Sequence, residues 1–273
     1  PELPEVETIR RIIEPQIVDR TIISAAVLNE QVIAYPDCDS FIDNIHHKNI
    51  CSMGRRGKFL MIYFTDESRL TLHLRMTGQL LVMPKDYPVE KHTHLILDLS
   101  DSQQIRYIDV RRFGRFWFIH KDETDRVSGI TKLGIEPFDK GLTAEYLKQS
   151  LNKRKKSIKE ALLDQAVVTG IGNIYSDEIL FAARIYPGTL CIGIKDSQWK
   201  KLARMIPAVL NKAIDDNRMT PEEYLAGRGK EYRNTPYFYV YGRDGEACKV
   251  CGEKLLKMVI AGRSCVYCPK CQK

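Results

Sequence analysis

The segment Gly170-Ile171-Gly172-Asn173-Ile174-Tyr175-Ser176-Asp177-Glu178 decides how the C-terminal half of the chain folds. Its glycines allow two backbone turns to pack tightly, so that N–H groups at the start of the following helix point outward. N–H groups arranged in this way bind a phosphate without reading base sequence. An ordinary helix cap has the same pattern, and the segment alone leaves both functions open.

Helical spacing of apolar residues extends on both sides of this turn. The periodic segments cover residues 144–151, 157–163, 173–183 and 197–214, which predicts a helical domain at residues 131–237. We expect its helix–turn–helix over about residues 154–184. The basic run Lys153-Arg154-Lys155-Lys156 directly precedes the turn. Such a run either begins a solvated helix or adds long-range attraction for a polyanion.

The N-terminal half has a different period. Short apolar runs, such as residues 60–64 and 95–99, alternate with polar turns between residues 17 and 120, which predicts a β-sandwich or barrel. Helices are expected at residues 3–13 and 36–47, and residues 121–141 are typical of a connection between domains. The predicted fold class is therefore α+β. An N-terminal β-sandwich with an N-terminal helix occupies residues 1–130, and the helical domain follows it.

Four cysteines near the C-terminus predict a metal site. Cys248-Lys249-Val250-Cys251 and Cys268-Pro269-Lys270-Cys271 enclose 16 residues, 252 to 267, which is the spacing of a tetrahedral four-thiolate zinc site. Between them we expect strands 254–260 and 264–267 joined by Ala261-Gly262-Arg263, a hairpin with an arginine at its tip. One structural Zn²⁺ per chain is predicted, in a zinc finger at residues 238–273. Two disulfides are the alternative, and Cys265 competes as a ligand because it forms a second CxxC pair with Cys268.

The composition fits a nucleic-acid-binding protein without requiring one. The net charge of +7 and the pI of about 8.9 favour a polyanionic partner such as DNA. No apolar run approaches the roughly 20 residues that cross a bilayer, and nothing resembles a signal peptide. The cysteines outside the two pairs are expected to be free thiols in a reducing cytoplasm. They are Cys38, Cys51, Cys191 and Cys265. Nothing in the chain calls for more than a monomer.

The chain begins Pro1-Glu2-Leu3-Pro4-Glu5-Val6-Glu7, which predicts amine chemistry. A secondary amine at Pro1 is a nucleophile, and its condensation with an aldehyde gives an iminium ion that withdraws electrons from neighbouring bonds. Glu2 and Glu5 have the i, i+3 spacing of one helix face, so they can accept the amine's proton or protonate a leaving group. The alternative is an ordinary helix start, because Pro and acidic residues suit a first turn.

Together these motifs resemble the formamidopyrimidine-DNA glycosylase family, bacterial base-excision enzymes for oxidised purines. The resemblance extends to three further segments, in the family's order. They are Arg55-Arg56-Gly57-Lys58-Phe59-Leu60, His73-Leu74-Arg75-Met76-Thr77-Gly78 and Asp109-Val110-Arg111-Arg112-Phe113-Gly114. The resemblance covers nearly the whole chain and implies that the central turn is the family's helix-two-turn-helix. It also implies a bacterial, nucleoid-associated protein whose partner is damaged double-stranded DNA.

The resemblance implies a reaction in which Pro1 attacks C1′ of the damaged nucleotide and displaces its base. Glu2 is expected to donate the proton that opens the sugar ring, and Glu5 to position or relay. Elimination of the 3′ and then the 5′ phosphate follows from the iminium ion. No cofactor is expected in this chemistry, because the zinc only holds a DNA-binding hairpin. The alternative from another class is a protein that binds distorted or abasic DNA without chemistry.

The family's DNA contacts map onto eight residues of this chain. Four match its phosphate contacts: Lys58, His73, Asn173 and Arg263. Tyr241 is carried over as a further DNA contact, with packing as the alternative because an aromatic residue before a turn usually packs. Three match residues that fill the space left by an extruded base: Met76, Arg111 and Phe113. Without the resemblance, core packing is the ordinary role for Met76 and Phe113, and an ion pair with Asp109 for Arg111.

One segment departs from the family. Between residues 215 and 234 the family usually has a loop rich in Gly, Ser and Thr that closes over the extruded base, whereas this chain is richer in charge. Oxidised guanine and formamidopyrimidines are expected as substrates from the rest of the chain. Oxidised pyrimidines, or abasic sites alone, are the alternatives at this point.

Overall fold

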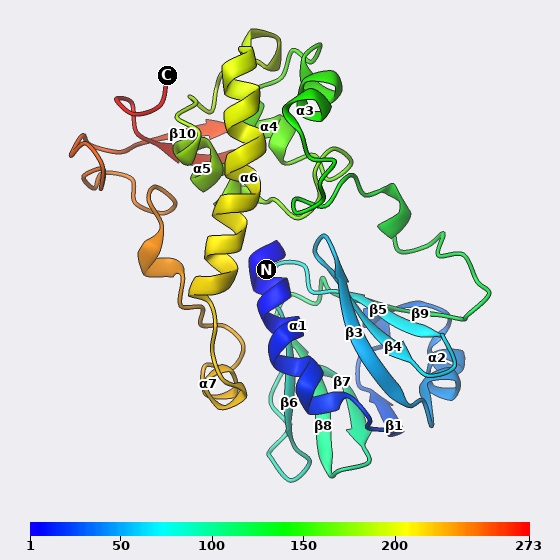
Figure 1. Cartoon of the computed structure of the whole chain (residues 1–273). Helices are drawn as coiled ribbons and strands as arrows, with labels where there is room; N and C mark the ends of the chain where they lie inside the picture. The colour runs from blue at the N-terminus through cyan, green and yellow to red at the C-terminus, as the bar shows by residue number, and fades with distance from the viewer. The chain divides into compact units, whose positions relative to one another are not determined.

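The computed structural model describes residues 1–273 and divides into two compact units (Figure 1). The β unit consists of Pro1 and residues 5–131 and 217–232, and the helical unit of residues 2–4, 132–216 and 233–273. This is an α+β fold, as predicted. The expected domain boundaries at 130/131 and 237/238 stay predictions.

Two sheets form the β unit. One sheet has the order β1 (Ile22–Val27), β7 (Thr93–Leu99), β8 (Gln103–Asp109), β6 (Gly78–Pro84), and all its pairs are antiparallel. The other has the order β2 (Ile33–Tyr35), β9 (Arg115–Ile119), β5 (Arg69–His73), β4 (Phe59–Phe64), β3 (Ile50–Arg56), with only β2 and β9 parallel. Apolar residues of both sheets share one core. This confirms the predicted sandwich.

Two helices of the β unit follow from local sequence. α1 (Leu3–Ile17) buries Val6, Ile9, Ile13 and Ile17, which lie on one face at helical spacing. α2 (Cys38–Ile45) is shorter than the predicted 36–47 because Asp37 caps it, accepting from Ser40 N at 2.9 Å.

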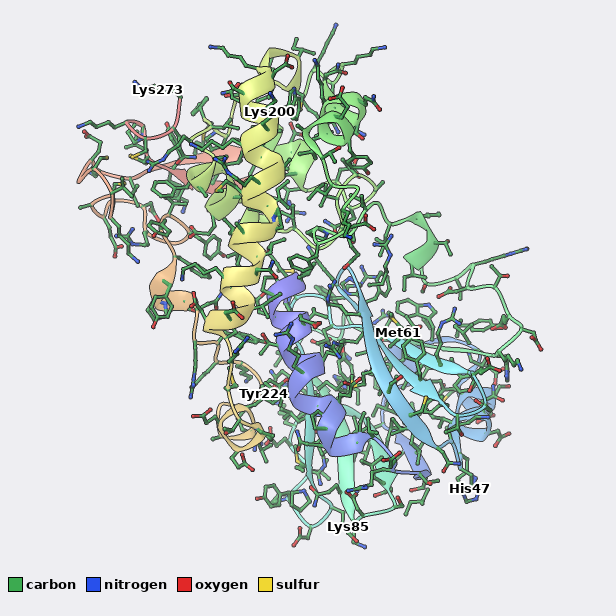
Figure 2. All side chains as sticks on the ribbon, in the orientation of Figure 1. His47, Met61, Lys85, Lys200, Tyr224 and Lys273 are labelled. Carbon is green, nitrogen blue, oxygen red and sulfur yellow. The ribbon has the colours of Figure 1, made fainter.

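A third helix of the β unit, α7 (Pro221–Ala226), lies in the segment that departs from the family and was not predicted. Thr220 and Glu223 form a capping box at its start. The buried Tyr224 side chain, labelled in Figure 2, joins the sandwich core, and its hydroxyl donates to Leu80 O at 2.9 Å. The charged loop is therefore anchored on β6 through a tyrosine.

The helical unit contains α3 (Ala144–Leu151), α4 (Ile158–Leu162), α5 (Asn173–Ala182) and α6 (Asp196–Asp216). They pack around a core centred on Trp199 and Tyr175. None of the helices in the chain is long and apolar enough to cross a membrane.

The last element of the helical unit is the hairpin of β10 (Leu256–Ile260) and β11 (Arg263–Tyr267). Its turn is Ala261-Gly262, both with positive φ, as two-residue hairpin turns require. Arg263 pairs with Ile260 and begins β11. The expectation that Arg263 belongs to the turn was wrong by one position, because a two-residue turn matches the strand twist better than three residues.

Candidate active site and nucleic-acid interface

The carboxylate of Glu2 occupies the N-terminus of α5. It accepts hydrogen bonds from Gly172 N at 2.8 Å, Ile174 N at 2.8 Å and Tyr175 N at 3.2 Å. These are first-turn N–H groups without partners inside the helix, and the positive end of the helix dipole favours an anion there. Glu2, which directly follows Pro1 in the chain, is therefore fixed to the helix-two-turn-helix.

The glycines of the turn make room for this N-terminal segment. A Cβ at Gly172 would come within 2.5 Å of Glu2 Cδ, and one at Gly170 within 2.8 Å of Leu3 Cβ. Gly170 also has φ +99°, and its carbonyl accepts from Leu3 N at 3.1 Å. The expectation that the N–H groups of this turn point outward to a phosphate was wrong for Gly172, because its N–H donates to Glu2.

Asn173 begins α5 beside this anchor. Its side-chain Oδ1 is buried without a hydrogen-bond partner, and its carbonyl accepts from Lys159 Nζ at 3.3 Å. The phosphate contact expected from Asn173 stays a prediction.

In the β unit, Glu5 and His73 lie in different environments. Glu5 is 5% exposed on α1. The pKa of the half-buried Tyr232 phenol is raised mainly by its loss of solvent and also by the negative charge of Glu5. His73 ends β5, and its Nδ1 accepts from Arg75 N at 3.0 Å. A neutral ring with an acceptor at Nδ1 carries its proton on Nε2, where it is available as a donor.

Burial, together with the nearby charges of Arg75, Lys58 and the Pro1 amino group, lowers the pKa of His73 from 6.5 to about 3. His73 is thus close enough to Lys58 and to the Pro1 amino group to interact electrostatically with each of them. With this pKa, His73 is a neutral hydrogen-bond donor at pH 7 near the predicted nucleophile.

The three predicted space-filling residues are exposed. Met76 is 67% and Phe113 48% exposed, so the alternative of core packing is wrong for both. The Arg111 guanidinium lies over the Phe113 ring, 4.8 Å from its centroid. Their roles in filling a duplex stay predictions.

Asp109 organises the loop that carries Arg111 and Phe113. Its carboxylate is fully buried and accepts from Tyr107 Oη at 2.5 Å, Gly114 N at 3.0 Å and Arg111 N at 3.1 Å. Asp109 therefore holds the Arg111 backbone, while the Arg111 side chain lies on Phe113 instead. Burial tends to raise the pKa of Asp109, but these hydrogen bonds and that from Thr77 leave it lowered.

The four predicted zinc ligands converge. The Sγ atoms of Cys248, Cys251, Cys268 and Cys271 all lie within 4.8 Å of one another. The pairs Cys248–Cys271 and Cys251–Cys268 are separated by 3.9 and 3.4 Å, close to the roughly 3.8 Å between sulfurs around a tetrahedral zinc. Four thiolates would hold Zn²⁺ as a structural ion. Cys265 does not join the cluster, because its buried thiol lies against Asp177.

Glu178 positions the segment that leads into the zinc finger. Its carboxylate accepts from Tyr239 N at 2.6 Å, Val240 N at 2.9 Å and Tyr241 N at 2.9 Å. The Tyr241 phenol is near the charges of Glu2 and Asp177, and burial together with these charges raises its pKa. Tyr241 is thus held close to Glu2, although its predicted DNA contact stays untested.

Family models match the chain in three parts. Residues 1–116 match the formamidopyrimidine-DNA glycosylase N-terminal domain, residues 133–223 its H2TH domain, and residues 245–273 a zinc finger found in FPG and IleRS. The chain therefore belongs to the formamidopyrimidine-DNA glycosylase family. This confirms the resemblance, and the zinc-finger match lies within the predicted zinc finger and contains the four cysteines.

Full-length relatives agree with this family. The formamidopyrimidine-DNA glycosylase of Pelotomaculum thermopropionicum is 40% identical over 100% of this chain and 99% of its own, and that of Trichormus variabilis 39% with the same coverage. Crystal structures of Lactococcus lactis Fpg with DNA containing an abasic site or Fapy-dG cover 100% of both chains, with TM-score 0.90 and 35% identity. A further complex of that protein, with an oxidised pyrimidine, has TM-score 0.90 and 34% identity over the same length.

The sequence reading missed the residues that hold these groups in place. Asp177, Glu178 and Lys159 were given no role, and Asp109 was considered only as an ion-pair partner of Arg111. A signal was present, since an acidic pair inside the otherwise apolar helix 174–181 indicates buried carboxylates with partners.

The depressed pKa of His73 predicts a pH-dependent stability. Because the folded pKa of about 3 is below the ordinary 6.5, the unfolded chain binds more protons between these values, and stability falls as pH drops below 6.5. The free energy of unfolding should lose about 2 kcal/mol of this contribution between pH 7.5 and pH 5. Urea denaturation of His73→Gln should show a smaller loss than wild type. His120→Gln serves as the control, and equal losses in wild type and His73→Gln would contradict the prediction.

The cysteine cluster predicts which thiols retain the metal. Cys268→Ser should lose zinc on dialysis against a chelator, because serine is a poor ligand in a thiolate site. Cys265→Ser should keep the wild-type zinc content, measured by metal analysis per mole of chain. Loss of zinc from Cys265→Ser with retention in Cys268→Ser would show that the wrong ligand set was assigned.

Proposed function

We propose that this protein is a bifunctional DNA glycosylase and AP lyase that removes oxidised purines from duplex DNA. The main support for this proposal is the position of the Glu2 carboxylate. It is hydrogen-bonded to the turn of the helix-two-turn-helix, and Glu2 directly follows Pro1 in the chain. Family membership supports glycosylase chemistry. The anchored carboxylate gives that chemistry a proton carrier beside its nucleophile.

In the proposed reaction the Pro1 nitrogen attacks C1′ of the extruded nucleotide, and the base leaves with the electrons of the glycosidic bond and takes up a proton. Glu2 accepts the proton of the resulting ammonium and passes it to O4′, so the sugar ring opens and C1′ becomes an iminium carbon. Loss of a proton from C2′ expels the 3′ phosphate, and a further elimination expels the 5′ phosphate. Glu5, buried on α1, positions or relays.

DNA binding is assigned to the predicted contacts. Lys58 and His73 of the β unit and Asn173 and Arg263 of the helical unit bind backbone phosphates, and Tyr241 is a further DNA contact. Met76 and Phe113 are exposed apolar side chains and Arg111 an exposed cation, which suits entry into a duplex from which a base has been extruded. One Zn²⁺ per chain holds the hairpin that presents Arg263. The chain acts as a monomer in the bacterial cytoplasm.

The most specific part of the proposal is the choice of damaged base. Oxidised guanine and formamidopyrimidines are favoured by family membership and by the Fapy-dG complex of the Lactococcus lactis relative. That same relative has been crystallised with an oxidised pyrimidine, which keeps such lesions as a second candidate. Tyr224 anchors α7 on β6, so the charged segment 215–234 has a defined position. From that position it can restrict which damaged bases are accepted.

Borohydride trapping tests the proposal. Duplexes carrying 8-oxoguanine opposite cytosine, or an abasic site, are incubated with the protein and reduced, and the adduct is mapped by mass spectrometry. An adduct at Pro1 on both duplexes is expected. An adduct on the abasic duplex alone would retain the lyase and redirect the search to other lesions. If neither duplex gives an adduct although the Pro1 amine is free, the protein is a non-catalytic binder of damaged DNA.

Substitution of Gly172 tests the role of the Glu2 anchor. In Gly172→Ala the new Cβ would displace the Glu2 carboxylate, and a misplacement of about 1 Å can slow such chemistry about a hundredfold. Single-turnover strand cleavage should fall by that order while the chain stays folded. Gly193→Ala is the matched control, because nothing lies within 4 Å of its added Cβ. Equal rates for the two variants would contradict the assignment.

A further inference from the structure

A buried ion pair joins α4 to α5. The side chains of Lys159 and Asp177 are 0% and 1% exposed, and Lys159 Nζ donates to Asp177 Oδ1. Both ions lose their hydration on burial, which their mutual attraction offsets only when further hydrogen bonds satisfy the remaining donors and lone pairs. The further hydrogen bonds of Lys159 and Asp177 therefore show which other parts of the helical unit the ion pair holds in place.

Each member of the pair has a second partner: for Lys159 it is a predicted phosphate contact, and for Asp177 it is a backbone amide in the strand that begins with Arg263. Lys159 Nζ donates to Asn173 O at 3.3 Å, which fixes the first residue of α5. Asp177 Oδ2 accepts from Val266 N at 3.1 Å, in the strand that begins with Arg263. Three residues of extended strand, roughly 10 Å, separate this bond from Arg263.

The other bonds between α5 and the C-terminal segment have different targets. Glu178 binds the backbone of residues 239–241, upstream of the cysteines. Gln272 lies downstream of β11, where it accepts from Cys268 N at 2.8 Å and donates to Ile185 O at 3.0 Å. Among these carboxylates and amides, Asp177 is the one that binds the hairpin strand itself.

We propose that Asp177, paired with Lys159, is a positioning residue that holds the zinc hairpin against the Asn173 turn, so that Arg263 and Asn173 bind DNA as one clamp. The inference rests on the proposed function, because it assigns a joint role to two of its DNA contacts. The buried pair loses hydration free energy, and its role in placing Arg263 explains why the fold contains it. Zinc folds the hairpin, whereas Asp177 sets where the folded hairpin stands.

A double-mutant cycle between Asp177 and Arg263 tests this. The affinity for a duplex with a tetrahydrofuran abasic analogue is measured by fluorescence anisotropy in wild type, Asp177→Ala, Arg263→Ala and the double variant, each with its zinc content and folding checked. Each single variant should raise Kd about tenfold, and the double variant no more than either. The slope of log K against log salt should fall by about one phosphate contact in all three.

Asp196→Ala is the matched control. Asp196 forms a Lys–Asp pair with Lys148 at 2.9 Å, but the two side chains are 73% and 41% exposed, so Kd should not change. If Asp177→Ala does not fold, Lys159→Met/Asp177→Leu removes both charges together and enters the cycle in its place. Additive effects of Asp177 and Arg263, or an unchanged Kd with zinc retained, would overturn the proposal. Failure of wild type to bind the duplex would instead overturn the proposed function.

Discussion

The bond between the Glu2 carboxylate and the N-terminus of α5 is the constraint from which the arrangement of the helical unit follows. It explains both glycines of the central turn, since Gly170 and Gly172 admit Leu3 and Glu2 where a side chain would collide. It also sets the role of the helix dipole, which here stabilises a protein carboxylate rather than a DNA phosphate. The amine that we propose as the nucleophile, at Pro1, needs a fixed backbone, and its neighbour Glu2 supplies one through three hydrogen bonds.

Hydrogen bonds from α5 also fix other parts of the helical unit. The first residue of α5 is Asn173, and about one turn later two consecutive carboxylates bind different parts of the C-terminal segment. Asp177 binds the hairpin strand and Glu178 the approach to the cysteines. In the β unit Asp109 has a comparable role, because its buried carboxylate shapes the loop that exposes Arg111 and Phe113. Buried carboxylates that accept backbone N–H groups thus place side chains which themselves remain exposed.

Local signals in the sequence predicted what local interactions decide. The zinc cysteines, the helix at 144–151 and the strands of the sandwich follow from spacing and periodicity, and the structure contains them. α7 was missed because its capping box, Thr220 and Glu223, lies in a short charged segment whose helix depends on Tyr224 reaching Leu80, far away in sequence. The partner of the central turn was missed for the same reason, since Glu2 is about 170 residues from it. For Met76 and Phe113 residue type alone favours burial, and only the family resemblance predicted their exposure.

Amide hydrogen exchange at the start of α5 tests the central claim most directly. In wild type the Gly172, Ile174 and Tyr175 amides should be protected by Glu2, and in Glu2→Ala all three should exchange at least tenfold faster. The Ser176 amide, which donates to Gly172 O at 3.0 Å, should keep its protection and serves as the internal reference. Equal protection of the three amides in wild type and Glu2→Ala would contradict the account, because α5 would then hold its N-terminus without the residue that carries Pro1.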